Sequence, residues 1–197
     1  MSKRRVVVTG MGILSPVGND LATAWKNVVE GVSGIAPISP VEIGDKTVDW
    51  NHYATRIAGE VRDFDPVDAF FTGAGADEAT DEKRRAIGKD FKRMDPFIHY
   101  GIVAGTHAFR QSGLKITDEN AGRIGVAAGA GIGGLHTIEA TSPELHDTGP
   151  RKVSPFFVPS SIINMVAGNL SLYPGLKGPN TALVSACTPA APHNGQA

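Results

Sequence analysis

The chain has 197 residues, with 19 lysines and arginines against 20 aspartates and glutamates, and its formal net charge is −1. This balance excludes a general electrostatic affinity for nucleic acid, and no apolar run is long enough to span a membrane. The N-terminal MSKRRVVVTG has too short an apolar run for a signal peptide. A single cysteine cannot form an internal disulfide, which favours a reducing setting. We therefore expect one cytoplasmic globular domain.

The first predicted elements are a strand and a helix joined by a glycine-rich loop. Residues 5–9 (RVVVT) form a continuous valine run without polar alternation, which predicts a buried strand. A helix from Asn19 or Asp20 to about Glu30 would end at Gly31. Its apolar stripe would contain Leu21, Trp25 and Val28 or Val29. The intervening loop has glycine spacing seen in dinucleotide sites, but Pro16 and a further turn separate it from the helix, which favours a structural role.

The next stretch contains weaker signals and a basic cluster. Residues 54–61 are a plausible short edge strand, residues 65–71 a short helix or turn, and residues 72–88 a solvated, flexible excursion. Three cations follow it closely: Lys89, Lys92 and Arg93. Such a cluster is either a solvated face or a docking site for an acidic partner.

The clearest predicted helix begins at Asp95, which can cap it, and ends at Gly113. One face combines small and apolar residues: Phe97, Gly101, Ile102, Gly105, Ala108 and Phe109. Small residues on a helix face indicate that another segment approaches closely. His99 and His107 lie on this helix, and we interpret both as packing or surface residues, because no cysteine or carboxylate is in register to share a metal.

A second buried strand is predicted at residues 123–128, followed by the glycine-rich loop 129–134 (GAGIGG). So many glycines indicate close approach to another backbone or a ligand. Residues 135–141 favour a helix, and residues 143–150 an irregular arm that leads to a second basic spot, Arg151 and Lys152. After the rigid aromatic stretch 154–159, Ser160 can cap a helix to about Leu170.

The only cysteine, Cys187, follows a predicted strand at 181–184 and precedes a predicted helix starting at Thr188. A thiol at a helix N-terminus is favoured as thiolate, so Cys187 is a candidate nucleophile; the alternative is a small buried hydrophobe. Strands alternating with helices predict an α/β fold with a mainly parallel sheet, where reactive groups lie beyond the carboxyl ends of strands. Cys187 and the 129–134 loop both hold that position and can line one pocket. If a helix starts at Cys187, His193 lies six residues and about 600° further around it, so its side chain points away from the thiol. No other residue is evident as a base for the thiol, and the acyl-transfer site looks half complete.

Several long motifs occur together in the chain: RVVVTGMGILSPVGN, KRMDPFIHYGIVAG, RIGVAAGAGIGGL, GPRKVSPFFVPSSIINMVAGNLS and GLKGPN followed by SACT. In this order they resemble the β-ketoacyl-[acyl-carrier-protein] synthases of the thiolase fold, in particular the elongating type II enzymes. The resemblance covers nearly the whole chain except about residues 37–51 and 70–88. It implies the N-terminal half of a thiolase-like fold, with a mainly parallel mixed sheet flanked by helices and the second half absent.

The resemblance implies a decarboxylating Claisen condensation that elongates fatty acyl chains. Cys187 would accept the acyl chain from acyl carrier protein, and the carbanion from malonyl-carrier protein would then attack the thioester. Ile132 and Gly133 match the end of the acyl pocket, and Phe157 matches a residue that reaches toward the acyl chain. The cations that match the carrier-protein docking face are Lys89, Lys92, Arg93, Arg151 and Lys152. The family consists of cytoplasmic homodimers without a metal or redox cofactor, whose closing strand, residues 181–185 here, pairs across the dimer.

Two departures from the family pattern matter. The family chain is about twice this length, and its two histidines, its lysine and the second oxyanion donor lie in the half that this chain lacks. After Cys187 the sequence has Pro189 and Pro192 where the family has a glycine-containing turn. Our hypothesis is a truncated or misread end. The alternative function is a non-catalytic interaction or dimerisation module, although a chain-length factor would lack the thiol. The three-carbon-starting synthases and thiolases are disfavoured by residues 149–159.

Overall fold

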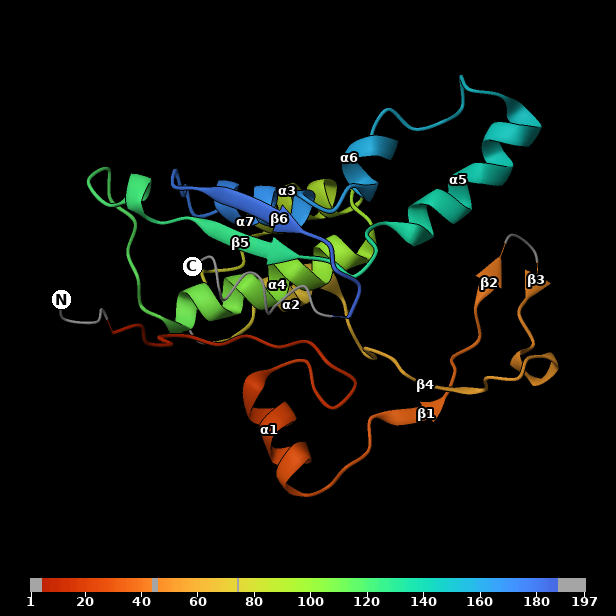
Figure 1. Cartoon of the computed structure of the whole chain (residues 1–197), viewed down its shortest axis with the longest axis horizontal. Helices are drawn as coiled ribbons and strands as arrows, with labels where there is room; N and C mark the ends of the chain where they lie inside the picture. Colours follow the sequence, from red (N-terminus) through yellow and green to blue (C-terminus); the bar gives the residue numbers. More distant parts are fainter. Residues whose placement is uncertain (1–4, 44–45, 74, 188–197) are drawn as a thin grey trace. The chain divides into compact units, whose positions relative to one another are not determined.

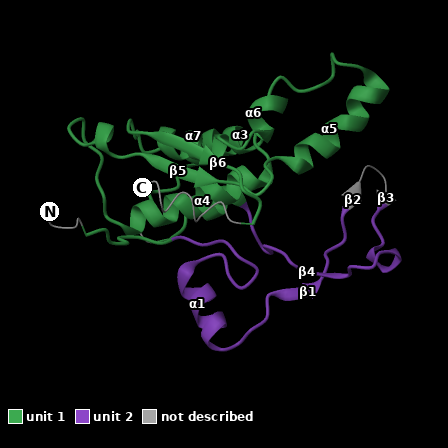
Figure 2. Cartoon of the chain, in the orientation of Figure 1, with its two compact units in different colours: residues 1–11, 66–197 green, residues 12–65 purple. Residues whose placement is uncertain are grey.

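The computed structural model describes residues 5–43, 46–73 and 75–187, and the chain divides into two compact units. The first combines the N-terminal residues up to Met11 with everything from Pro66 onward, and the second is Gly12–Asp65 (Figure 1, Figure 2). Each unit has its own secondary structure and is described by itself.

The smaller unit contains one helix and two antiparallel strand pairs. Its elements are α1 (Leu21–Val29), β1 (Ile35–Pro37) paired with β4 (Ile57–Gly59), β2 (Glu42–Ile43) paired with β3 (Lys46–Thr47), and a 3-10 turn at Trp50–His52. The predicted helix boundaries are confirmed: Asp20 accepts a hydrogen bond from the Thr23 amide, and Gly31 is left-handed at φ 70°. The expected apolar stripe of α1 is not buried, because Trp25 is 67% exposed.

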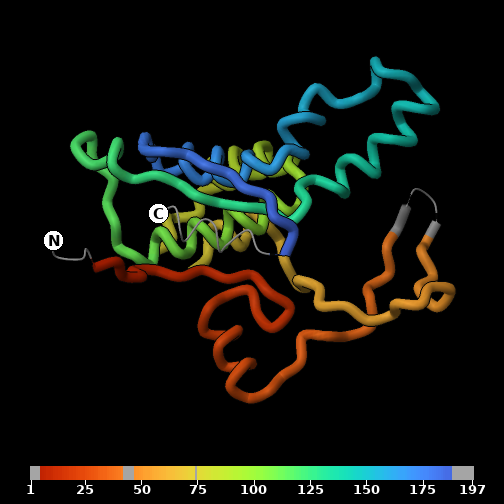
Figure 3. The backbone as a smooth tube through the Cα atoms, in the orientation of Figure 1, coloured from red at the N-terminus to blue at the C-terminus, as the bar shows by residue number. Residues whose placement is uncertain are grey.

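The larger unit is built around α4 and a parallel strand pair. Its elements are α2 (Pro66–Phe70), α3 (Asp81–Phe91), α4 (Pro96–Gln111), a 3-10 turn at Ala121–Arg123, β5 (Val126–Gly129), α5 (Leu135–Thr148), α6 (Phe157–Ser161), α7 (Met165–Leu172) and β6 (Asn180–Leu183). Strands β5 and β6 run side by side in the same direction (Figure 1, Figure 3), with Val126 opposite Asn180 and Gly129 opposite Leu183. Helix α7 packs against α4 and against both strands.

Helix α4 forms as its sequence predicts and carries the core of this unit. Asp95 caps it by accepting a hydrogen bond from the Phe97 amide at 3.2 Å, and Pro96 fits the first turn, where its missing N–H costs nothing. The largest fully buried side chains of the described residues all lie on it: Ile98, Ile102 and Val103. The predicted close approach is also confirmed: a methyl group at Gly101 or Gly105 would collide with side chains of α7.

The predicted strand at residues 5–9 is wrong in this structure. The segment is not paired, and Val6, Val7 and Val8 are 89%, 67% and 80% exposed. A valine run is stable as a buried strand only when a neighbouring strand satisfies its amides and side chains cover both faces. In the described part of the chain, residues 5–9 have no neighbouring strand and no covering side chains, because the only parallel sheet there consists of β5 and β6.

Three helix boundaries also differ from the sequence expectations. The irregular stretch after residue 72 ends at Thr80, which caps α3, and α3 then buries Ile87 and Phe91. Helix α5 continues through Pro143 to Thr148, where an irregular arm was expected; it projects from the sheet (Figure 1) without a buried residue. The single helix expected from Ser160 is divided into α6 and α7, because Ile162 takes an extended conformation between them.

Candidate active site

Cys187 lies in a sharp turn directly beyond β6. The strand ends at Leu183, and Ala186 adopts a left-handed conformation with φ 48°, which is uncommon for a residue with a Cβ and costs about 1 kcal/mol or more. The small side chains at this point make the turn possible, as the sequence predicts. The Cys187 thiol is exposed, so the alternative of a small buried hydrophobe is wrong. The helix predicted from Thr188 and His193 lie outside the described residues.

The glycine-rich loop and the thiol turn leave the same edge of the sheet. Because β5 and β6 are parallel and in register, Gly129 and Leu183 end them side by side. The following segments then touch: a Cβ placed on Gly131 would lie 3.2 Å from the carbonyl oxygen of Ala186. The prediction that residues 129–134 and Cys187 occupy one edge is therefore confirmed, and the glycine at 131 is what lets the two backbones approach.

The proposed acyl-pocket residues lie on this loop and on the helix that packs against it. Gly133 has φ 102°, and its neighbour Gly134 donates its N–H to the Ser161 carbonyl at 2.9 Å at the end of α6. Phe157 begins α6 and is half-buried, whereas Ile132 is 71% exposed. The structure thus brings the loop and α6 together, and the roles of Ile132, Gly133 and Phe157 in binding an acyl chain remain predictions.

The segments that carry the two basic spots are linked by one side-chain contact. The first group, Lys89, Lys92 and Arg93, is exposed at the C-terminal end of α3, where the helix dipole favours cations; the second, Arg151 and Lys152, is exposed just before α6. The Arg93 guanidinium lies over the ring of Phe156 at 4.5 Å from its centroid, and Phe156 is 39% exposed. This cation–π contact joins the two segments. Sequence reasoning missed the role of Phe156, although an aromatic residue four positions after Lys152 was a usable signal.

The two histidines of α4 hold neighbouring segments in place, as predicted. The Nε2 atom of His107 lies 2.8 Å from the carbonyl oxygen of Ala69 in α2, and Nε2 of His99 lies 2.8 Å from that of Phe91 in α3. Burial lowers the pKa of His99, while the Phe91 carbonyl and the Asp95 charge oppose this shift. Among the residues that the structure describes, no cluster of three or more histidine, cysteine or acidic side chains could hold a metal ion.

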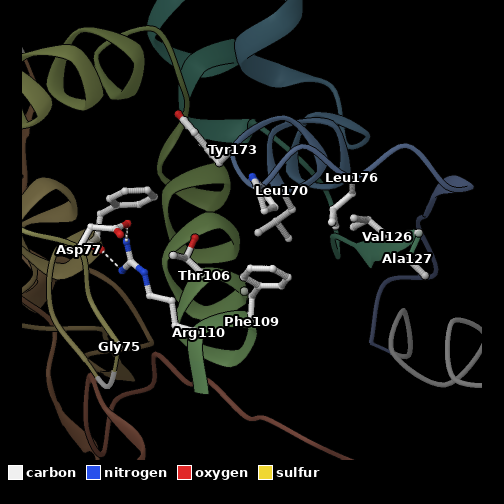
Figure 4. Close-up of a pocket in the computed structure, with 14 residues that line it drawn as sticks. Gly75, Asp77, Thr106, Phe109, Arg110, Val126, Ala127, Leu170, Tyr173 and Leu176 are labelled. Carbon is white, nitrogen blue, oxygen red and sulfur yellow. Dashed lines mark hydrogen bonds and ion pairs between the residues drawn. The ribbon is translucent and has the colours of Figure 1, made fainter. Parts of the chain in front are cut away.

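A cavity of about 460 Å³ lies elsewhere in the larger unit, between α4, β5 and α7. Figure 4 shows Arg110 reaching toward Asp77 on one side, with Leu170 and Val126 on the other. The Arg110 guanidinium is 3.3 Å from the Asp77 carboxylate and also donates to the Phe70 carbonyl, so its hydrogen-bonding groups are engaged within the unit. Neither Cys187 nor any of the proposed acyl-pocket residues lines this cavity.

Residues 3–192 match the sequence profile of the family described as Beta-ketoacyl synthase, N-terminal domain. The chain belongs to this family. Three relatives of this chain are 3-oxoacyl-[acyl-carrier-protein] synthase 2 of Vibrio harveyi, at 53% identity, of Staphylococcus aureus, at 43%, and of Coxiella burnetii, at 40%. The alignments cover 95%, 93% and 95% of this chain but only 40%, 39% and 40% of the relatives. The chain therefore spans about two fifths of their length.

Solved structures confirm the thiolase-like fold class. The chain superposes on the ishigamide ketosynthase/chain length factor with a TM-score of 0.68 at 20% identity, covering 93% of this chain and 40% of that one. A beta-ketoacyl synthase from Burkholderia phymatum gives 0.65 at 20% identity, with 99% and 43% covered. A type II polyketide ketosynthase solved with its acyl-carrier protein gives 0.63 at 23% identity, with 94% and 42% covered. This coverage confirms the expected N-terminal part of the fold.

The described residues include no helix that combines the length and the apolar character needed to cross a membrane.

Proposed function

We propose that Cys187 is the acyl-accepting nucleophile of a β-ketoacyl-[acyl-carrier-protein] synthase that elongates fatty acyl chains. The observation that carries the proposal is the geometry of the Cys187 turn: an exposed thiol directly after a parallel strand, with Ala186 left-handed and in contact with the glycine-rich loop. In parallel α/β sheets, reactive groups lie at this edge. The names of the relatives, 3-oxoacyl-[acyl-carrier-protein] synthase 2, support the reaction class.

The chemistry proceeds in two stages. In the first, the Cys187 thiolate attacks the thioester carbonyl of an acyl-carrier protein, and the carrier thiolate leaves and takes up a proton. In the second, malonyl-carrier protein loses CO₂, and the resulting carbanion attacks the Cys187 thioester and releases the thiolate. Family resemblance places the two histidines, the lysine and one oxyanion donor for the second stage beyond this chain. We therefore assign acyl acceptance to the chain itself, and condensation to a protein with the complete fold.

We further propose that the acyl chain enters between the 129–134 loop and α6, beside Ile132, Gly133 and Phe157. The contact between Gly134 and Ser161 supports this, because it holds the two walls of such a pocket together. The exposed Ile132 side chain is available to contact a ligand, and its size would determine how long an acyl chain the site accepts.

An acidic acyl carrier protein is the proposed macromolecular partner. Its docking face would be the exposed cations at the end of α3 and before α6: Lys89, Lys92, Arg93, Arg151 and Lys152. The Arg93–Phe156 contact supports a single surface rather than two independent ones. Charge complementarity of this kind accelerates encounter and orients the partner, and its effect falls with salt.

We also propose a cytoplasmic homodimer in which residues 181–185 pair across the interface. Strand β6 supports this because, within the described sheet, it is an edge strand whose only ladder is with β5. An edge strand offers N–H and C=O groups to a second chain. A reducing cytoplasm would keep the single thiol in its reactive form.

Acyl loading is the decisive experiment. The purified protein is incubated with acyl-carrier protein, and the intact mass is measured beside a Cys187→Ala variant. We expect an acyl adduct on the natural protein and none on the variant. Malonyl-carrier protein is then added, and we expect no elongated product from the 197-residue chain. Binding of the carrier without an adduct would support the non-catalytic interaction module instead, and robust elongation would show that the site is complete.

A further inference from the structure

Asp95 caps two helices at once. The residue is 4% exposed, and its Oδ1 atom accepts a hydrogen bond from the Phe97 amide in the first turn of α4, at 3.2 Å. Its Oδ2 atom accepts one from the Thr137 amide in the first turn of α5, at 2.8 Å, across 42 positions of sequence. The amides of both helix N-termini thus converge on one buried carboxylate, which satisfies its charge.

Helix α5 has no local substitute for this cap. Its own N-cap position is Gly134, which makes no side-chain capping bond. The first amides of a helix lack intrahelical partners, so a helix without a cap side chain depends on what its surroundings supply. For α5 the supplied acceptor is Asp95, and the second attachment is the bond from the Gly134 N–H to the Ser161 carbonyl.

The same residue also reaches α6. The backbone N–H of Asp95 points to the Ser160 carbonyl at 3.4 Å, and Ser160 is buried. The start of α4, the start of α5 and the end of α6 therefore meet at Asp95. The loop 129–134 enters this junction directly, since Gly134 is its last residue, and its third residue, Gly131, approaches Ala186 beside the thiol.

We infer that Asp95 is a positioning residue for the acyl chain: its carboxylate fixes the first turn of α5 and thereby sets where Ile132 and Gly133 stand relative to Cys187. This inference rests on the proposed function, because it concerns the same acyl pocket. Asp95 does not contact the thiol. Its effect is on the wall of the pocket, so its loss should change which acyl lengths are accepted more than it changes the reactivity of the cysteine.

Asp95→Ser separates the two capping roles. Serine is a preferred N-cap residue, so its hydroxyl can still accept from the first turn of α4. A single short hydroxyl cannot reach Thr137 as well, so the cap of α5 is lost. Asp95→Asn is the second variant: it keeps the shape and one acceptor, but its amide nitrogen faces one of the two donors. Asp20→Asn is the matched control, because Asp20 caps α1 in the other unit.

Two measurements are made on the 197-residue protein and on each variant. Hydrogen exchange reports the amides of residues 134–138, with the first turn of α4 as an internal reference. Intact mass reports Cys187 loading from carrier thioesters of increasing acyl length. For Asp95→Ser we expect exchange at residues 134–138 to accelerate about tenfold, as befits a lost hydrogen bond to a charged group. We expect the ratio of long- to short-chain loading to change severalfold, with neither effect in Asp20→Asn.

Unchanged exchange at the start of α5 in both Asp95 variants would overturn the inference. Faster exchange with an unchanged loading ratio would overturn the positioning role and leave only a structural cap. If the natural protein takes no acyl group at all, the proposed function fails and the acyl-positioning role fails with it. The exchange measurement distinguishes that result, because it tests the link from Asp95 to α5 without any acyl substrate.

Discussion

Because α7 packs closely on α4, replacing a glycine of these helices with alanine should stabilise the protein at one position and destabilise it at another. In Gly101→Ala, the new methyl carbon would lie 2.4 Å from Cγ1 of Val166 and 3.2 Å from its Cγ2. Carbon atoms in contact prefer about 3.5–4.0 Å, so one of the helices or the valine has to move by roughly 1 Å. Val166 is buried, and a β-branched side chain in a helix has essentially one favourable rotamer, so the valine cannot simply turn away.

Two opposing contributions set the magnitude. Replacing a helical glycine with alanine is worth about 1 kcal/mol of helix propensity, whereas overpacking a close contact costs about 1–3 kcal/mol. For Gly101→Ala we expect a net loss of up to about 2 kcal/mol in the free energy of unfolding. Gly105→Ala should cost less, because the atoms that its methyl group would meet are the flexible end of Leu170. Gly168→Ala, on α7 with open space around it, should stabilise by up to about 1 kcal/mol.

Urea unfolding of the three variants beside the natural protein measures these differences as shifts of the midpoint at constant slope. Thermal midpoints should follow, at about 2–4 °C for each kcal/mol in a chain of this size. The expected order of stability is Gly168→Ala, then the natural protein, then Gly105→Ala, then Gly101→Ala. If Gly101→Ala stabilises as much as Gly168→Ala does, α7 does not pack on α4 at the distance that the structure gives.

Three further predictions concern polar groups. The Tyr173 hydroxyl is buried without a hydrogen-bond partner among the described residues, and burial together with the Asp90 charge raises its pKa to about 12. Because Tyr173→Phe removes this unsatisfied hydroxyl, it should raise the free energy of unfolding measured in urea by about 1 kcal/mol. Burial lowers the pKa of His99, so the unfolded chain binds a proton at higher pH than the folded chain. Stability should therefore be full above the ordinary value of 6.5 and decline as the pH falls from there toward the lowered pKa; His99→Gln should flatten this decline in unfolding series across pH. Lys92→Glu should weaken acyl carrier protein binding in titrations at low salt, with little difference left at high salt.

Each of these has a matched control. For Tyr173→Phe it is Tyr53→Phe, an exposed tyrosine of the other unit, which should have little effect. For His99 it is the exposed His146, whose replacement should leave the pH dependence as it was. For Lys92 it is Lys26 of α1, whose reversal should not change carrier binding. If Tyr173→Phe lowers the free energy of unfolding, the tyrosine hydroxyl makes a hydrogen bond that contributes to stability. If His99→Gln leaves the loss of stability at acid pH unchanged, His99 does not cause that loss. If Lys92→Glu weakens carrier binding equally at low and high salt, the effect of Lys92 is not electrostatic.

The parts of the fold that were predictable from sequence depend on local chemistry. The ends of α1 and α4 follow from a capping aspartate at one end and a left-handed glycine at the other, and these need no knowledge of the rest of the chain. The turn at Cys187 was predictable for the same reason, since small residues directly after a strand permit it. The glycines on α4 indicated close packing, but not that Val166 and Leu170 would provide it.

The failures involve partners that are distant in sequence. Residues 5–9 have the composition of a buried strand, but burial depends on neighbours that the valine run itself cannot specify. The hydrogen bond between Asp95 and Thr137 and the ring contact between Arg93 and Phe156 both join distant segments, and neither leaves a periodic pattern. Helix α5 continues past Pro143 although a proline removes one amide donor, and nothing in the local sequence indicates that it should.

The parallel pairing of β5 and β6 also determines when the thiol acquires its geometry. Val126 cannot meet Asn180 until α5, α6 and α7 have all been synthesised between them. Pairings of such large separation carry a loop-closure cost and form slowly compared with local helices. Until this pairing forms, the turn that presents the Cys187 thiol has no strand pair to hold it. Reactivity of the thiol toward an acyl-carrier thioester would then be a kinetic marker of the pairing of β5 and β6 during folding.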